Sequence, residues 1–198
     1  MHPNRAFHWN DEAEMLAFVD RVSFATICVD GPAMVHAPVT AGPGGFRFHV
    51  SRSNRAVPRL DGARAIVSVL GPDAYISPDW YGVPDQVPTW NYLAVEAEGP
   101  LRQLDEADLV ALLDDLGARH EARLAPKPEW TRDKMDPARF EAMVKAIVGF
   151  ELTVEEMRGT RKLGQHKAPE QRAAVSDALD ALGMAELAGL SRPISSTE

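Results

Sequence analysis

The stretch GPDAYISPDWYGVPDQVPTWNY, residues 71–92, constrains the fold more than any other part of the chain. It contains four prolines, two tryptophans and three tyrosines. Because each proline removes a backbone donor and fixes its own φ, the stretch cannot form a helix, and we expect a stiff aromatic loop. Two interpretations are open for its aromatic side chains: a wall against a flat ligand, or a plug at a barrel end or a subunit interface.

Before this loop, residues 34–40 and 46–51 predict two strands joined by a turn at 41–45. One register separates their side chains into an apolar and a polar side, and burial should hold that register. Its apolar pairs are Ala41/Phe46, Val39/Phe48 and Ala37/Val50. Its other pairs are Thr40/Arg47, Pro38/His49 and His36/Ser51. The polar side is therefore a candidate binding surface.

The hairpin leads into the sequence SRSNRAVPRL at 51–60. Asn54 predicts the N-cap of a short helix, and Pro58 is tolerated in its first turn. Free amides at a helix N-terminus, together with Arg52 and Arg55, are suited to a phosphate monoester. The alternative interpretation is a solvated basic turn.

The remaining pattern predicts a mostly β first half and a helical second half. Expected strands are 23–29, 63–70, two strands between 87 and 104, and 149–154. Three helices are expected to begin after Asn10, Asp105 and Asp136, and a fourth is expected at 169–188. A turn is expected at 30–32, an exposed loop at 123–135, a basic loop at 157–167 and a frayed tail from Ser191.

Composition describes an ordinary globular chain of 198 residues, 45% hydrophobic and 25% charged, for which one domain is the default. A formal charge of −8 argues against a protein whose main task is to hold a polyanion. The single cysteine, Cys28, is expected to be a small buried hydrophobe, so no disulfide framework is predicted. Without an apolar leader or a membrane-spanning stretch, the expected location is the cytoplasm.

Common catalytic signatures do not occur. The sequence has no Walker loop, no GxGxxG after a strand, no HExxH and no GxSxG. His36 and His49 lack a nearby carboxylate or cysteine, so no metal site is predicted from them. The remaining candidates are the basic turn at 51–60, which suits a phosphate, and the rigid aromatic stretch at 71–92. Together they suit a phosphorylated aromatic cofactor.

Five blocks of sequence carry a resemblance to a known family. They are Met1-His2-Pro3, His36-Ala37-Pro38, HVSRSN at 49–54, GPDAYISP at 71–78 with Trp80-Tyr81, and VPTWNY at 87–92. In this order and spacing the chain resembles the PaiB family of FMN-binding proteins, known as negative transcriptional regulators. The fold of that family is the split barrel shared with pyridoxamine-phosphate oxidases.

The resemblance covers nearly the whole chain and implies an α+β fold. We expect an antiparallel, Greek-key split β-barrel with peripheral helices and a helical C-terminal part. A single FMN-binding domain would span 1–198, with a barrel core at about 20–104 and 147–158 and helical additions at 105–146 and 168–190.

The resemblance also implies a homodimer with one FMN in each of two clefts at the subunit interface. Residues expected around the phosphate and ribityl chain are His36, Ala37, Pro38, Val39, Thr40, His49, Ser51, Arg52 and Asn54, with Arg52 as the leading phosphate ligand. Residues expected near the isoalloxazine are Trp90, Asn91, Tyr92, Lys162 and Gln165, with either the same chain or the partner chain contributing the last two.

Some positions depart from the family pattern. Where the family usually reads Lys-Leu-Ser-Gln-Asn, this chain has Lys162-Leu163-Gly164-Gln165-His166, so a hydroxyl and an amide are missing. Ser51 stands where the family more often has Ala, and Arg55 where it commonly has Pro. These changes keep the expected pocket polar and cationic.

Three functions follow from the resemblance and stay open. The first is a flavin-dependent oxidoreductase with a small-molecule substrate or electron donor. The second is a flavin-responsive or non-enzymatic transcriptional regulator, although the net charge does not favour DNA binding. The third is a haem-binding split barrel, with His36, His49 or His166 as the axial ligand.

Overall fold

The fold was obtained as a computed structural model, which describes residues 2–31, 33–42 and 44–193. These residues form two compact units. The central unit comprises the described residues of 12–69 and 96–157, and the terminal unit those of 1–11, 70–95 and 158–198.

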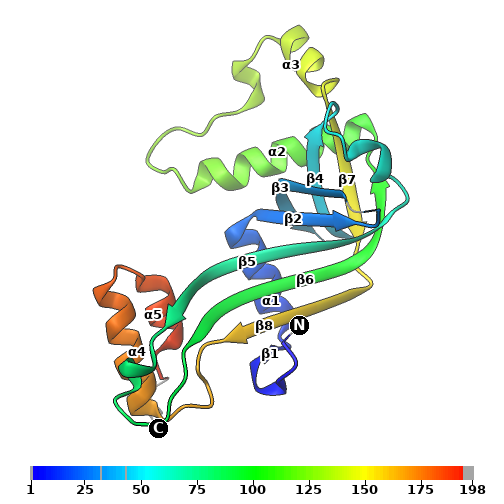
Figure 1. Cartoon of the computed structure of the whole chain (residues 1–198). Helices are drawn as coiled ribbons and strands as arrows, with labels where there is room; N and C mark the ends of the chain where they lie inside the picture. Colours follow the sequence, from blue (N-terminus) through cyan, green and yellow to red (C-terminus); the bar gives the residue numbers. More distant parts are fainter. Residues whose placement is uncertain (1, 32, 43, 194–198) are drawn as a thin grey trace. The chain divides into compact units, whose positions relative to one another are not determined.

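Eight antiparallel strands form the sheet of the described chain. They are β1 (His8–Trp9), β2 (Phe24–Val29), β3 (Ala33–Gly42), β4 (Gly45–Ser51), β5 (Arg64–Ile76), β6 (Thr89–Gln103), β7 (Ile147–Thr153) and β8 (Glu156–Lys162). Their order is β1-β8-β6-β5-β2-β3-β4-β7, and a further pairing of β6 with β7 closes six strands into a ring. This is the predicted α+β, antiparallel barrel architecture (Figure 1).

Strand β3 changes partner along its length. Its first half pairs with β2, Ala37 opposite Ala25, and its second half pairs with β4, Val39 opposite Phe48. The predicted register is therefore confirmed at Ala41/Phe46, Val39/Phe48 and Thr40/Arg47. It is wrong for the other three pairs: His36, Ala37 and Pro38 pair with β2, whereas His49, Val50 and Ser51 pair with β7.

The core of the central unit lies on the apolar side of these strands. Val39, Phe46, Phe48, Phe150 and Leu152 are fully buried. The rings of Phe48 and Phe150 stack with centroids 5.7 Å apart. Complete burial of such side chains is worth about 1.5–3 kcal/mol each, which fixes the register of β3, β4 and β7.

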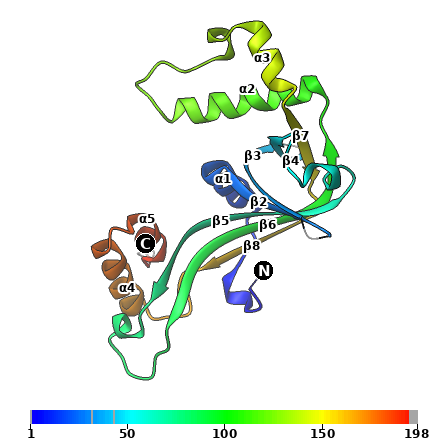
Figure 2. The same cartoon turned by 45° about the horizontal axis from the view of Figure 1, so that its top comes forward.

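Helix α2 (Glu106–Ala122) packs on the opposite, polar side of β3, β4 and β7 (Figures 1 and 2). Asp105 caps it as predicted, because its Oδ1 accepts from the backbone N–H of Asp108 at 2.8 Å. Gly149 permits close packing: a Cβ there would lie 3.0 Å from the Cδ1 atoms of Leu104 and Leu109. The side of the hairpin predicted as an open binding surface is thus covered by a helix.

Charged side chains join the helices of the central unit to this sheet. Arg119 of α2 donates to Asp115 at 2.8 Å and to Asp20 of α1 (Glu12–Val22) at 2.7 Å. Asp20 Oδ1 also accepts from the N–H of Ala41 at 3.1 Å. A third helix, α3 (Pro137–Val144), begins at the predicted Asp136 cap with proline in its first turn.

The terminal unit contains helices α4 (Pro169–Ala181) and α5 (Ala185–Ser191), which pack against each other, and α4 also contacts the 3₁₀ turn η3 (Pro78–Tyr81). Figure 1 shows this helix pair in orange and red. Three short 3₁₀ turns complete the described chain: η1 (Arg5–Phe7), η2 (Val57–Arg59) and η4 (Arg132–Lys134).

Several predicted elements differ in the structure. One strand, β6, replaces the two expected between 87 and 104. The strand continues through Gly99, because a residue without a Cβ leaves room for the carbonyl oxygen of Thr153 beside the backbone. The expected basic loop at 157–167 begins with β8, which pairs with β1 and lies beside β6 in the sheet. The expected helix at 169–188 is two helices, since Gly183 adopts φ +78° between them.

Two side chains are placed differently as well. Cys28 is exposed, because strand alternation turns Ile27 and Val29 inward instead. Ser191, where fraying was expected to begin, is buried at the end of α5, and Arg192 pairs with Asp177 at 3.0 Å. Four expectations include positions outside the described residues: Met1 in the first sequence motif, Pro32 in the turn at 30–32, Pro43 in the hairpin turn, and 194–198 in the tail.

Candidate functional site

A cavity of about 230 Å³ lies within the terminal unit. Its lining comes from four segments: the N-terminal residues, η3, the start of β6 and the turn that follows β8. Two of the residues predicted near a flavin ring, Asn91 and Lys162, line this cavity together. Strand pairing places the end of β8 beside β6, which explains how residues 71 positions apart in the sequence meet here.

Asn91 is the most informative residue of the cavity. Its side chain is 2% exposed, and its Oδ1 has no hydrogen-bond partner among the described residues. A buried carbonyl oxygen without a donor costs about 1–3 kcal/mol, a loss that a water or a ligand donating a hydrogen bond to Oδ1 would offset.

Lys162 is held in a fixed position at the end of β8. Its Nζ donates to the backbone carbonyl of Trp90 at 2.9 Å and to the hydroxyl of Thr89, and it lies 5.9 Å from the ring centroid of Phe7. Burial lowers the pKa of this amine below its ordinary value. An ammonium group in such a site is a strong donor for an electron-rich ligand atom.

A second basic group lies on the following turn. Lys167 donates to Gln86 Oε1 at 2.6 Å, and its Nζ lies 4.7 Å from the ring centroid of Tyr81. The ring of His166 packs edge-on against Phe7 at 5.4 Å. Burial, followed by the charges of Lys167 and Lys162, lowers the pKa of His166.

The remaining predicted residues of the terminal unit have other contacts. Gln165 folds back on its own turn, where its Oε1 accepts from the N–H of Leu163 at 2.8 Å and its Nε2 donates to the carbonyl of Arg161. Trp90 is 49% exposed and donates from Nε1 to Asp73 at 2.7 Å, with Tyr75 edge-on at 6.2 Å. Tyr92 is half-buried in β6.

In the central unit, the predicted residues of β3 alternate between two environments. Ala37 and Val39 are buried in the core, so only their backbone can meet a ligand. His36 is exposed, and its Nδ1 lies 3.1 Å from the Thr26 hydroxyl. Pro38 is half-buried opposite Phe24.

Two predicted residues lie on the side of the sheet that α2 covers. Thr40 is 1% exposed, and its Oγ1 has no hydrogen-bond partner in the described part of the chain. The same is true of His49 Nδ1, and burial lowers the pKa of this imidazole. Burial at His49 therefore favours the neutral imidazole.

The turn predicted to hold phosphate is compact but not helical. The hydroxyls of Ser51 and Ser53 lie 2.9 Å apart, and Asn54 Oδ1 accepts from the N–H of Ala56. The helix expected after Asn54 is only the three-residue η2, so the expected array of free helix amides is absent from this part of the described chain.

Arg52, the expected phosphate ligand, has two backbone acceptors. Its Nε donates to the carbonyl of Lys145 at 2.8 Å and its Nη2 to that of Ile147 at 3.0 Å. The guanidinium thus links the end of β4 to the junction of α3 and β7.

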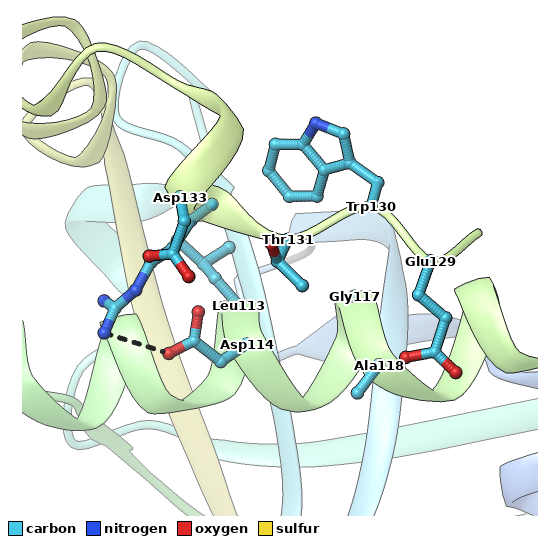
Figure 3. Close-up of a pocket in the computed structure, with 9 residues that line it drawn as sticks. Leu113, Asp114, Gly117, Ala118, Glu129, Trp130, Thr131 and Asp133 are labelled. Atoms are coloured by element: carbon cyan, nitrogen blue, oxygen red, sulfur yellow. Dashed lines mark ion pairs between the residues drawn. The ribbon is translucent and has the colours of Figure 1, made fainter.

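A second hollow, of about 330 Å³, lies in the central unit between α2 and the loop before η4 (Figure 3). Trp130 stands over it, and Gly117 belongs to the helix wall. One end is crossed by an ion pair between Arg132 and Asp114 at 3.5 Å. None of the residues predicted to bind the cofactor lines it.

Sequence reasoning missed several residues of the terminal cavity, namely His2, Phe7, Thr89 and Lys167 as ligand-facing groups. Lys167 was assigned to a basic loop and Phe7 to an unremarked N-terminal segment. The basic, carboxylate-free turn after β8 is a signal for Lys167, whereas only the fold shows that Phe7, His2 and Thr89 lie beside it.

Comparison with known proteins identifies the family to which the chain belongs. Residues 1–156 match the sequence model of the family described as "Putative FMN-binding domain". The chain belongs to this family. FMN is the family's cofactor, so the predicted cofactor is confirmed. Over 175 residues the chain is 29% identical to the "Protease synthase and sporulation protein PAI 2" of Bacillus subtilis (strain 168), covering 84% of this chain and 83% of that protein. The resemblance based on sequence motifs is therefore confirmed.

Solved structures support the fold. The FAD and heme binding protein from Mycobacterium smegmatis superposes with a TM-score of 0.59 at 19% identity, over 84% of this chain and 79% of that one. The flavocytochrome Anf3 from Azotobacter vinelandii gives 0.60 at 17% identity, over 82% and 73%. The split-barrel prediction is confirmed.

The described residues contain no group of three His, Cys, Asp or Glu side chains that could hold a metal ion. None of their helices combines the length and the apolar character needed to cross a membrane.

Proposed function

We propose that the terminal cavity binds the pyrimidine edge of the FMN isoalloxazine ring and that the protein is a flavin-dependent oxidoreductase. The observation that carries this proposal is that Asn91, whose buried Oδ1 has no partner in the described chain, lines the same cavity as Lys162. The pyrimidine edge offers one N–H between two carbonyl oxygens, so it needs one acceptor and neighbouring donors.

The residues fit that requirement. Asn91 supplies the missing acceptor, and Lys162 supplies a charged donor. When bound, FMN supplies the hydride and electron chemistry. The residues of this chain orient the ring and set its charge environment: a fixed ammonium beside the pyrimidine favours the form of the ring that carries negative charge, as the reduced ring does.

The proposal includes a homodimer with one FMN at each of two interface clefts, as in the family that the sequence resembles. The Ser51–Asn54 turn of the central unit is the proposed phosphate site. Arg52 keeps donor capacity there, since two of its five N–H groups donate to the backbone carbonyls of Lys145 and Ile147. An unidentified small molecule would exchange electrons with the bound flavin.

A regulatory role is the second candidate, and the similarity to the sporulation protein of Bacillus subtilis favours it. In this version the protein would sense flavin or its redox state and pass the signal to DNA or to a protein partner. A net charge of −8 favours a protein partner over direct contact with DNA. Specific duplex binding that survives moderate salt would support the DNA version.

Haem binding is a third candidate, favoured by the fold shared with the FAD and heme binding protein. His36 is exposed on β3 and is the axial ligand with the freest access, whereas His49 lies under α2. Haem and flavin absorb visible light differently, so one spectrum of the purified protein separates these cofactors.

The test begins with an absorption spectrum of freshly purified protein and an FMN titration of any apoprotein. Reduction of the bound flavin by a nicotinamide donor, with repeated turnover when an acceptor is added, is the expected result for an oxidoreductase. Lys162→Gln should lower the reduction potential of the bound flavin, and Lys162→Arg should restore much of it. Bound flavin that no nicotinamide donor reduces would reject the enzyme and leave the regulator.

A further inference from the structure

We propose that the terminal cavity also binds a small organic anion, carrying a carboxylate or phosphate group, through Lys167 and His166. This inference rests on the proposed function, because the anion would be the molecule that meets the flavin in the same cavity. It assigns a substrate class that the family description does not contain.

The charge of the cavity is the first argument. Its described lining includes two lysines and two histidines and no aspartate or glutamate, although the whole chain carries a net charge of −8. A carboxylate-free basic cavity on an acidic protein concentrates positive potential in one place. Such a cavity attracts anions and repels the cations that the rest of the surface would attract.

The partners of the lysines are the second argument. Lys167 donates to the neutral amide oxygen of Gln86, and Lys162 donates to the neutral oxygens of Thr89 and Trp90. Neither ammonium forms an ion pair within the described chain. A partly desolvated cation that is oriented by neutral acceptors gains most from an incoming anion, because no internal salt bridge has to be broken.

The electrostatics at His166 agree with this assignment. The charges of Lys167 and Lys162 both contribute to lowering its pKa, after burial. The two ammonium groups thus place positive charge around the imidazole, which lines the same cavity. A bound anion would offset that charge and favour the protonated imidazole, which could then donate a hydrogen bond to it.

The apolar part of the lining limits the shape of the ligand. Phe7, Tyr81 and Val87 contribute apolar surface, and the volume of about 230 Å³ is small. With Asn91 and Lys162 directed to the flavin, the remaining groups suit a compact molecule with a flat or short apolar body and one anionic group.

The experiment compares benzoate with benzamide, which have nearly the same shape but differ in charge. Binding to the FMN-loaded protein is measured from the perturbation of the flavin absorption spectrum, and binding to the apoprotein by calorimetry. We expect benzoate to bind at least about tenfold more tightly than benzamide, as a charge-assisted contact predicts. Equal affinities would overturn the proposal.

Variants identify the cation responsible. Lys167→Gln should weaken benzoate binding about tenfold and leave benzamide binding unchanged, whereas Lys167→Arg should retain most of the benzoate affinity. Lys134→Gln is the matched control, because Lys134 is exposed in the central unit and donates to the Glu129 carbonyl. Unchanged benzoate affinity in Lys167→Gln would overturn the assignment.

One further comparison separates the anion from the cofactor's own phosphate. FMN and riboflavin differ by that phosphate, so both are titrated into the Lys167→Gln apoprotein. Small and equal changes in the affinities for FMN and riboflavin would support the proposal. A lower affinity for FMN with a normal affinity for riboflavin would show that Lys167 binds the cofactor's phosphate, and the proposal would be rejected. If the protein bound no flavin at all, the proposed function would fail, and calorimetry on the apoprotein would still decide whether the cavity selects anions.

Discussion

Replacing Asn91 by leucine should make the apoprotein more stable and the holoprotein weaker in its hold on FMN. Asn91 is almost fully buried, and its Oδ1 lacks a partner among the described residues. An unsatisfied buried carbonyl costs about 1–3 kcal/mol, so its removal should return about 1 kcal/mol after some loss of fit. For a chain of this size that corresponds to a rise in Tm of about 2–4 °C.

The same substitution removes the acceptor proposed for the flavin N–H. The loss of one buried hydrogen bond, about 1–3 kcal/mol, corresponds to a rise in Kd of about 5- to 150-fold. Differential scanning fluorimetry of the apoprotein and quenching of FMN fluorescence measure the two effects independently. A higher Tm of the apoprotein together with a weaker affinity for FMN is expected for a residue that serves binding at a cost in stability.

Ser176→Ala provides the matched control in the same unit. Ser176 is also buried, but its hydroxyl donates to the carbonyl of Ala188 at 2.8 Å, and it does not line the cavity. Its removal breaks that bond and should lower Tm while FMN affinity stays the same. A large fall in Tm for Asn91→Leu with unchanged FMN affinity would show that Asn91 supports the fold only, and the reasoning would be refuted.

Three further predictions concern the central unit. Burial lowers the pKa of His49 in the folded chain. Between that pKa and about 6.5, the unfolded chain binds more protons than the folded chain. The free energy of unfolding should therefore fall as the pH drops through this window. His49→Gln should reduce that fall in denaturant titrations at several pH values; an identical pH profile would contradict the burial argument. Gly99→Ala should lower Tm by about 6–12 °C, because its Cβ would lie 1.8 Å from the Thr153 carbonyl oxygen. Gly117→Ala, with no atom within 4 Å of the added Cβ, should be neutral or stabilising, and a similar loss in both variants would reject the steric explanation. Arg52→Ala should lower Tm by about 2–4 °C by removing its bonds to two backbone carbonyls; no change would show that these bonds contribute nothing.

Much of the fold could be predicted because local signals agreed with it. The Asp105 and Asp136 caps and the turn-side register of the hairpin depend on residues close together in the sequence. The loop expected at 71–92 is wrong at both ends, because β5 continues to Ile76 and β6 begins at Thr89. Partner exchange along β3 could not be predicted. Both halves of β3 show the same alternation of buried and exposed side chains. Only the closure of the six strands into a ring determines which neighbouring strand pairs with each half.

The site was predicted in part for the same reason. Asn91 and Lys162 were found through motifs, and the structure brings them to one cavity. The covering of Thr40 and His49 by α2 was missed, because a helix that begins at Asp105 gives no local indication of the sheet face it will occupy. Arg52 was assigned from its charge, the helix N-terminus expected beside it and the family resemblance, and none of these shows that two of its N–H groups donate to carbonyls 93 and 95 residues away.

The exchange of partners in β3 has a consequence for how this protein can change over evolution. A residue inserted or deleted near Pro38 would leave one half of the strand in step and turn the other half over, moving either Ala37 or Val39 out of the core. The neighbouring Val39 N–H is already committed to the Ser23 carbonyl at 3.1 Å. Length changes should therefore accumulate in the loop at 123–131 and be absent from 33–42, a pattern that sequences of distant relatives can test.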